Sequence, residues 1–482
     1  MALTSRKHPS GLWFISSSAA FFCISFGLVT SLLVLYLIHQ LGFESKQAYA
    51  LFGAFFSLIF GLPVFGGYLS SYFGFKRAML WSNILLILGA GLLAIPGDHY
   101  LYLGLACFAS GTGMYAPTYM TLQGKLYARE DTHREGAYTL SYVITNLGFL
   151  VASVSGGYIQ RYFSYHMCFA IGAAVDLVPL GLFIFAIAPI RAHEEKSIAP
   201  LTRLSAPWAW FGMITSSLLM VGICCFLLKH ANLNNFLLVV CAVLAIGSLS
   251  YLALTQKNKR DRARLWVFMG LSILSTGFWI VYSLEPSLLT VFIENNVNRN
   301  LWGHLIPPSV FYGLDPFFII LIGLVLGVLW VRLRERNKDL SLPFKFSLSL
   351  LSLVIALTLL GGLIGMHGKA NLLNLWWIVL VYFFLTLSEL LISPIGQAMV
   401  GRLAPEKLEG GLMGVWQMFC GASGAISGFL GQWVNVPDHA SVSVTNPIYM
   451  RGFLEMAAGS LIFCIISFSL VPLIRRVISQ AG

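Results

Sequence analysis

The stretch LTLSELLISPIGQAM, from Leu385 to Met399, lies inside an apolar segment that extends from about 373 to 400. An apolar segment of this length exceeds the roughly 20 residues that a helix needs to cross the hydrocarbon core of a bilayer. Glu389 is the only charged residue of the segment and falls near its middle. The sequence therefore predicts a transmembrane helix that carries a carboxyl group at mid-membrane depth.

The rest of the chain has the same apolar character. Of its 482 residues, 57% are hydrophobic and only 10% are charged, and the mean hydropathy is +0.80. A soluble protein needs far more charge to cover its surface, so the composition predicts an all-α polytopic membrane protein. We expect fourteen transmembrane helices, at about 11–40, 47–73, 77–96, 99–124, 136–160, 166–190, 205–228, 234–256, 266–293, 305–331, 346–366, 373–400, 410–434 and 449–474.

Lys and Arg residues are unevenly distributed over the connecting loops. With the N-terminus placed in the cytoplasm, 24 of the 30 Lys and Arg residues fall in cytoplasmic loops and tails. Cytoplasmic loops of membrane proteins carry such an excess, so both termini are expected in the cytoplasm and the number of spans is expected to be even. The net charge of +11 is thereby explained by topology, and no nucleic-acid partner is expected.

The sequence contains no pattern typical of a metal site or an enzyme. The eight cysteines lie in apolar runs, and no C-x-x-C or His/Cys spacing is present. No nucleophile–base pair is evident either, so we expect no cofactor, no metal and no enzymatic activity. The N-terminal MALTSRKHPSG is too short and polar for a cleaved signal peptide, so the first helix is expected to remain.

An internal repeat divides the chain. REGAYTLSYVITNLG (134–148) matches LEGGLMGVWQMFCGA (408–422), and YAPTYMTLQGKL (115–126) matches ISPIGQAMVGRL (392–403). Two matches in the same order indicate two homologous halves, an arrangement typical of transporters with a substrate site between the halves. We expect an N-terminal six-helix bundle at 1–190, a linker with two inserted helices at 191–264, and a C-terminal six-helix bundle at 265–482.

Several motifs resemble one known family. They are HPSGLW (8–13), LLVLYL (32–37), GTGMYAP (111–117), SYVITNLG (141–148), IPPSVFYGLDPFFIILI (306–322), SELLISPIG (388–396) and GLMGVW (411–416). In these motifs the chain resembles the proton-dependent oligopeptide transporter family of the major facilitator superfamily. The resemblance covers both halves and the two-helix insertion of bacterial members. It implies a major facilitator fold, transport of small peptides by alternating access, and a location in the bacterial inner membrane.

Charged residues that the family usually carries are replaced here. The family's first-helix E-x-x-E-R motif reads Ala19, Phe22 and Cys23, a later first-helix arginine is Thr30, a fourth-helix lysine is Ala116, and a seventh-helix glutamate is Ser283. Glu285 follows two residues later. Two residues rotate a helix face by about 200°, so Glu285 is not expected to replace the missing glutamate and is placed toward the outer rim.

The residues that remain point to an amine site. The resemblance implies that Glu389 forms a salt bridge with the substrate amine, and that Asp315, where the family commonly has asparagine, faces the same cavity. Glu389 could instead be a protonated residue bonded to a neighbouring helix. Asp315 could bond local backbone before Pro316. Asn146 matches a family asparagine and could accept from an amine, or form only an interhelical hydrogen bond.

Further residues complete the expected site. Tyr142 and Trp416 occupy matching places in the two halves and could form aromatic walls that favour cations. Pro117, Pro316 and Pro394 are expected to kink their helices beside the cavity. The small-residue spacing of Gly421, Gly424, Gly428 and Gly431 would allow a close helix approach.

The function expected is alternating-access transport of small peptides or peptide-like, amine-bearing solutes. The usual coupling residues are missing, so Glu389 and Asp315 are the remaining candidates for proton coupling. Three alternatives remain open. They are an ordinary proton-coupled di- and tripeptide symporter, a facilitator without proton coupling, and a non-transporting sensor on the same scaffold. The expected partners are the solute, the lipid bilayer and, if coupling exists, protons. The oligomeric state is not fixed by the sequence, and a monomer is compatible with it.

Overall fold

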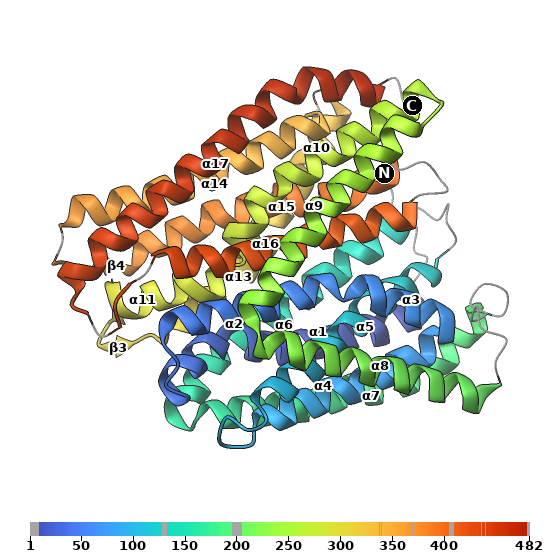
Figure 1. The fold of residues 1–482 in the computed structure, drawn as a ribbon, viewed down its shortest axis with the longest axis horizontal. Helices are drawn as coiled ribbons and strands as arrows, with labels where there is room; N and C mark the ends of the chain where they lie inside the picture. The colour runs from blue at the N-terminus through green and yellow to red at the C-terminus, as the bar shows by residue number, and fades with distance from the viewer. Residues whose placement is uncertain are drawn as a thin grey trace. The chain divides into compact units, whose positions relative to one another are not determined.

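The computed structural model describes residues 9–127, 133–194, 205–336, 338, 340–368, 370–403, 409–434, 436–438 and 440–479. These residues are almost entirely helical (Figure 1). The elements up to the insertion are α1 (Ser10–Leu35), the π-helical turn η1 (Tyr36–Gln40), α2 (Ser45–Gly61), α3 (Pro63–Phe73), α4 (Phe75–Leu93), α5 (Leu101–Lys125), α6 (His133–Tyr162) and α7 (Tyr165–Glu194). The inserted helices are α8 (Ala206–Lys229) and α9 (Ala231–Thr255).

The remaining helices are α10 (Lys259–Tyr282), the π-helical turn η2 (Glu285–Leu289), α11 (Thr290–Asn296), α12 (Pro308–Tyr312), α13 (Leu314–Glu335), α14 (Leu342–His367), α15 (Leu375–Leu403), α16 (Glu409–Val434) and α17 (Val442–Ser479). Four two-residue strands lie in the loops. β1 (Val297–Asn298) pairs in parallel with β4 (Leu373–Asn374), and β2 (Asn300–Leu301) pairs antiparallel with β3 (His304–Leu305).

All fourteen expected spans correspond to helices of the structure. Twelve helical stretches within the described residues are long and apolar enough to cross a membrane. The other two spans are α5 and α16, which are long enough but contain more glycine and hydroxyl side chains. The prediction of an all-α polytopic membrane protein is therefore confirmed.

Three of the expected spans are interrupted rather than continuous. Pro63 starts a new helix after α2, Pro286 lies in the turn η2 after α10, and Gly313 separates α12 from α13. Proline lacks the backbone N–H that would continue the helical bonding and clashes with the preceding turn, which explains the first two breaks. The break before α13 places Asp315 in the first turn of that helix.

The contacts divide the chain into two compact units. Unit 1 comprises Met1–Thr30 and Leu62–Lys229, and unit 2 comprises Ser31–Gly61 and His230–Gly482. In unit 1, α4 packs against α5 and α7, and α8 packs against α5. In unit 2, α14 packs between α15 and α17, which run side by side with it in Figure 1, while α2 and α9 pack against α16.

Glycines allow the closest helix contacts in both units. The four glycines Gly421, Gly424, Gly428 and Gly431 all face α2, so the close helix approach predicted from their spacing is confirmed. In unit 1, a Cβ atom at Gly66 of α3 would lie 2.2 Å from the backbone oxygen of Gly113 in α5. Neither backbone could yield without separating the two helices.

We expect Gly66→Ala to lower the free energy of unfolding by about 1–3 kcal/mol, because the added methyl group overpacks the α3–α5 contact. The matched control is Gly91→Ala in α4, where a Cβ atom would have no neighbour within 4 Å. The control should be neutral or slightly stabilising, because alanine favours a helix more than glycine. Thermal unfolding of the purified variants measures both, and equal shifts would contradict the packing argument.

Candidate functional site

Two buried carboxyl groups meet in unit 2. Asp315 is 4% exposed and Glu389 is 7% exposed. Their carboxyl groups lie close enough to interact, and a hydrogen bond between two carboxyl groups needs a proton on one of them. The Asp315 Oδ1 atom also accepts a hydrogen bond of 2.8 Å from Thr386 Oγ1. We call Asp315 and Glu389 the acid pair, and Thr386 is its threonine.

Local structure explains why these three side chains converge. Thr386 and Glu389 are three residues apart on α15 and therefore share one helix face, which packs toward α13. Asp315 lies in the first turn of α13, where unpaired backbone N–H groups and the helix dipole favour a negative charge. Asp315 therefore bonds across to α15, and the alternative of a bond to local backbone before Pro316 is not what the structure shows.

Tyrosine hydroxyl groups surround the acid pair. Tyr282 and Tyr312 interact with each other, and both interact electrostatically with Asp315 and Glu389. Tyr382, one turn before Thr386, is fully buried, and its hydroxyl has no hydrogen-bond partner among the described residues. The site thus combines acceptors for a cation with phenol groups that can either donate or accept.

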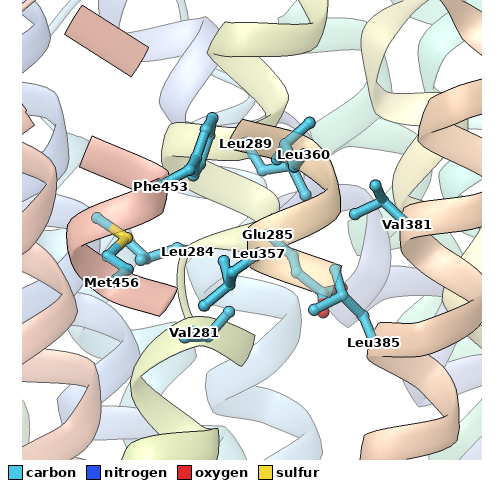
Figure 2. Close-up of a pocket in the computed structure, with 10 residues that line it drawn as sticks. All are labelled: Val281, Leu284, Glu285, Leu289, Leu357, Leu360, Val381, Leu385, Phe453 and Met456. Carbon is cyan, nitrogen blue, oxygen red and sulfur yellow. The ribbon is translucent and has the colours of Figure 1, made fainter. Parts of the chain in front are cut away.

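Glu285 adds a third carboxyl group to this region. It is 2% exposed, interacts electrostatically with Asp315, and its Oε2 atom has no partner among the described residues. Figure 2 shows its carboxyl oxygen beside Leu385 of α15, at the edge of a small cavity. Apart from Glu285 the cavity lining is apolar, and its volume of about 20 Å³ has room for one water molecule.

Glu285 was expected to lie near the outer rim, and that placement stays a prediction. The structure does bring it close to Asp315, although a rotation of about 200° from Ser283 argued that it would not replace the missing glutamate. That argument assumed a regular helix through residues 283–285. The structure instead ends α10 at Tyr282 and begins the π-helical turn η2 at Glu285, so the rotation per residue is not that of an α-helix. Ser283 uses its own hydroxyl to bond the backbone oxygen of Trp279 at 2.7 Å.

Unit 1 holds the remaining polar candidate, Asn146. Its side chain is 7% exposed, and its Nδ2 atom donates a 2.9 Å hydrogen bond to the backbone oxygen of Tyr142 in the same helix, α6. This bond lies within α6 and is not interhelical. The amide nitrogen keeps a second N–H donor, and the amide oxygen is an acceptor that can bind an amine. Tyr142 itself is half-buried.

Aromatic rings and hydroxyl groups pack around the positions where the family usually has charged residues. In unit 1, Phe22 stacks on Tyr115 with ring centroids 4.3 Å apart, and the Tyr115 hydroxyl lies 2.9 Å from Ser18 Oγ. Thr30 bonds the backbone oxygen of Phe26 in its own helix, and Cys23 is buried. Helix α1 contains no charged residue. No cation is therefore offered to a substrate carboxylate from this helix.

The other expected residues have mixed outcomes. Trp416 is 2% exposed and therefore packed inside unit 2 rather than presented on an open wall. Pro117 lies inside α5, and Pro316 lies in the first turn of α13. Pro394 falls in the part of α15 whose side chains lie outside the described residues. Among the described residues, no group of three or more His, Cys, Asp and Glu side chains is placed to hold a metal ion.

Comparison with known proteins decides the family. A profile described as PTR2: POT family matches residues 76–447 of the chain. The chain belongs to the POT family. The dipeptide and tripeptide permease B of Aliivibrio fischeri (strain MJ11) is 30% identical over 457 residues, which cover 93% of this chain and 91% of the permease. The permease of the same name from Photorhabdus luminescens is 29% identical, covering 94% and 93%.

Solved structures agree with this assignment. A crystal structure of a peptide transporter POT in complex with sulfate superposes with a TM-score of 0.85 at 22% identity, covering 99% of this chain and 97% of the other. A POT family transporter in complex with 5-aminolevulinic acid gives a TM-score of 0.83 at 22% identity, covering 97% of each chain. The fold is therefore the major facilitator fold of POT proteins, with two six-helix bundles and a two-helix insertion. The relatives are permeases, so the expectation of a protein that is not an enzyme is confirmed.

Four site residues were missed by the sequence reasoning. They are Tyr282, Tyr312, Tyr382 and Thr386. Thr386 precedes Glu389 by three residues on α15, and that spacing puts its polar side chain on the same helix face as the buried carboxyl group. A search for polar neighbours at helical spacing around Glu389 would have found Thr386.

We expect Thr386→Val to lower the free energy of unfolding by about 1–3 kcal/mol. Valine has nearly the same shape but cannot donate, so a buried oxygen of Asp315 loses a hydrogen bond. Thr386→Ser keeps the hydroxyl and should retain most of the stability. The thermal unfolding temperatures of the two variants test the role of this bond, which would be refuted by a valine variant as stable as the wild type.

Proposed function

We propose that this POT protein moves small peptides or peptide-like, amine-bearing solutes across the membrane by alternating access. Family membership and the printed names of the relatives, dipeptide and tripeptide permeases, support the class of transport. One solved POT family transporter is described in complex with 5-aminolevulinic acid, a solute that carries an amine. The observation that carries the proposal is the buried acid pair of Asp315 and Glu389 with its threonine.

The chemistry of the pair favours a cationic ligand group. An ammonium group offers three donors, and it can replace the shared proton by bonding both carboxylates. Hydrogen bonds to charged groups are the stronger kind, and they strengthen further in a buried site. Asn146 would add a neutral acceptor from the N-terminal half through its amide oxygen. Tyr142 and Trp416 would contribute aromatic surface as the cavity opens.

The opposite end of a peptide meets a different environment. A free carboxylate that enters the N-terminal half finds Cys23, Thr30 and Ala116 where the family usually supplies basic residues. A desolvated and unpaired charge is costly. Solutes whose carboxylate is blocked or absent should therefore be favoured over ordinary free peptides, and cationic solutes over neutral ones.

The remaining features of the proposal concern topology. We place the protein in a bacterial inner membrane with both termini in the cytoplasm, as the loop charges favour. The two bundles are assigned to residues 1–190 and 265–482, joined by the linker and inserted helices at 191–264. Protons are proposed as partners only where they compete with an amine for the acid pair.

We expect Glu389→Gln to weaken binding of an amine-bearing ligand by about tenfold or more, because the charge is lost while the shape is kept. Uptake and binding are measured on protein in proteoliposomes. The matched control is Glu455→Gln on α17, which changes a half-exposed glutamate paired with Arg451. An unchanged affinity in Glu389→Gln would make this carboxyl group structural. A complete lack of uptake of any solute by the wild type would favour the sensor alternative.

An inward proton gradient is expected not to drive concentrative uptake of a neutral dipeptide. Glu389 cannot hold a proton and an ammonium group at the same site, so competition gives amine–proton exchange, whereas symport needs separate sites for both. Accumulation is measured in proteoliposomes with and without an imposed pH difference. Robust gradient-dependent accumulation of such a peptide would favour the ordinary symporter and contradict the loss of proton coupling. Equal uptake in both conditions would agree with the loss of proton coupling.

A further inference from the structure

The two inserted helices belong to different units of the structure. The chain passes from unit 1 to unit 2 between Lys229 and His230, at the turn that joins α8 to α9. Helix α8 is fixed within unit 1, where Trp81 Nε1 of α4 donates to Ser217 Oγ at 2.5 Å. Helix α9 packs within unit 2 against α2 and α16. The insertion is therefore not a separate module.

Two buried asparagines attach the start of α9 to α2. Asn234 is 1% exposed, and its Nδ2 atom donates to Ser57 Oγ at 3.0 Å and to the backbone oxygen of Ala54 at 3.3 Å. Asn235 is fully buried, and its Nδ2 atom donates to the backbone oxygen of Ala50 at 3.2 Å. The two amides thus hold consecutive turns of α2.

The same place is where α2 meets α16. We call the contact of Tyr49, Gly53 and Ser57 of α2 with Gly424, Gly428 and Gly431 of α16 the seam. A Cβ atom at Gly53 would lie 2.6 Å from Gly428 Cα, and one at Gly428 would lie 3.0 Å from Asn235 Nδ2. Three helices therefore meet around Gly53, Gly428 and Asn235. Gln432 of α16 adds a bond of 3.3 Å to Asn232 of α9.

The physics of the membrane makes these amide bonds significant. Lipid chains are as apolar as side chains, so no hydrophobic force presses α2 onto α16, and close packing of small residues with interhelical hydrogen bonds must hold them together. Helix α2 belongs by sequence to the N-terminal bundle and α16 to the C-terminal bundle. In an alternating-access transporter, one bundle rocks against the other, so contacts between the bundles change during the cycle.

We propose that α9 is a positioning helix that keeps the seam closed through Asn234 and Asn235. The proposal rests on the alternating-access function proposed above, but it concerns the conformational equilibrium and not the solute.

The test is hydrogen–deuterium exchange, measured on the full-length protein without ligand. Asn235→Leu removes the amide while keeping the number of side-chain heavy atoms, and Asn234→Ala only removes atoms. Interhelical bonds of this kind convert to about a three- to eighteenfold change in the opening equilibrium. We expect exchange to rise by such a factor in peptides from α2 and α16, while peptides from α4 and α5 keep the wild-type rate.

The matched control is Ser248→Ala, also on α9, whose hydroxyl bonds only the backbone of its own helix. It should leave the exchange of α2 and α16 unchanged. The proposal would be overturned if α2 and α16 exchanged at the wild-type rate in both asparagine variants. A uniform rise in exchange over all helices would also overturn it, because a merely structural role of the asparagines would produce that result. If Asn235→Leu does not fold, Asn234→Ala carries the test alone. Since no solute is present, this outcome is independent of the result for Glu389→Gln.

Discussion

A charged group inside the hydrocarbon core of a membrane needs a polar or charged partner, and the site in this protein follows from that constraint. A charged side chain at the centre of a bilayer costs about 2.5–3.5 kcal/mol on insertion scales, so Glu389 could not persist facing lipid. The structure buries Glu389 next to Asp315, and Asp315 accepts a hydrogen bond from Thr386. The break between α12 and α13 contributes, because it brings a helix N-terminus to Asp315.

The same constraint separates the two halves chemically. The C-terminal half concentrates carboxyl and phenol groups around α10, α13 and α15, whereas α1 and α5 of the N-terminal half contribute stacked rings and hydroxyl groups. In the proposed site, both carboxyl groups that would bind an amine therefore come from the C-terminal half, and the N-terminal half adds only the neutral amide of Asn146. The asymmetry gives a ligand an orientation even without a basic residue to hold its other end.

Much of the fold could be predicted from the sequence, because apolar length and loop charge report directly on membrane crossing. The fourteen spans and the glycine contact of α16 followed from composition and spacing. The interruption at Ser283–Glu285 was not anticipated, although Pro286 was a visible signal, since a π-helical turn depends on the tertiary packing around it. The bond of Asn146 to its own helix likewise depends on the rotamer, which residue identity does not fix.

The site was predicted in part. Glu389 and Asp315 stood out because a lone carboxyl group in an apolar run is unusual, and the structure brings them together. Their partners Thr386, Tyr312 and Tyr382 are ordinary residues for a membrane helix, and only the packing of α13 against α15 makes them part of the site. The side chain of Pro394 lies outside the described residues, so its expected kink stays a prediction.

The central claim is that recognition rests on the ligand's amine and not on its carboxylate. Isothermal titration calorimetry on the purified wild-type protein tests this with three matched ligands: a dipeptide, its N-acetylated form and its C-terminal amide. The account predicts that N-acetylation abolishes binding, because the acid pair loses its cationic partner, and that amidation leaves the affinity equal or higher. Binding that survives N-acetylation but is lost on amidation would contradict the account.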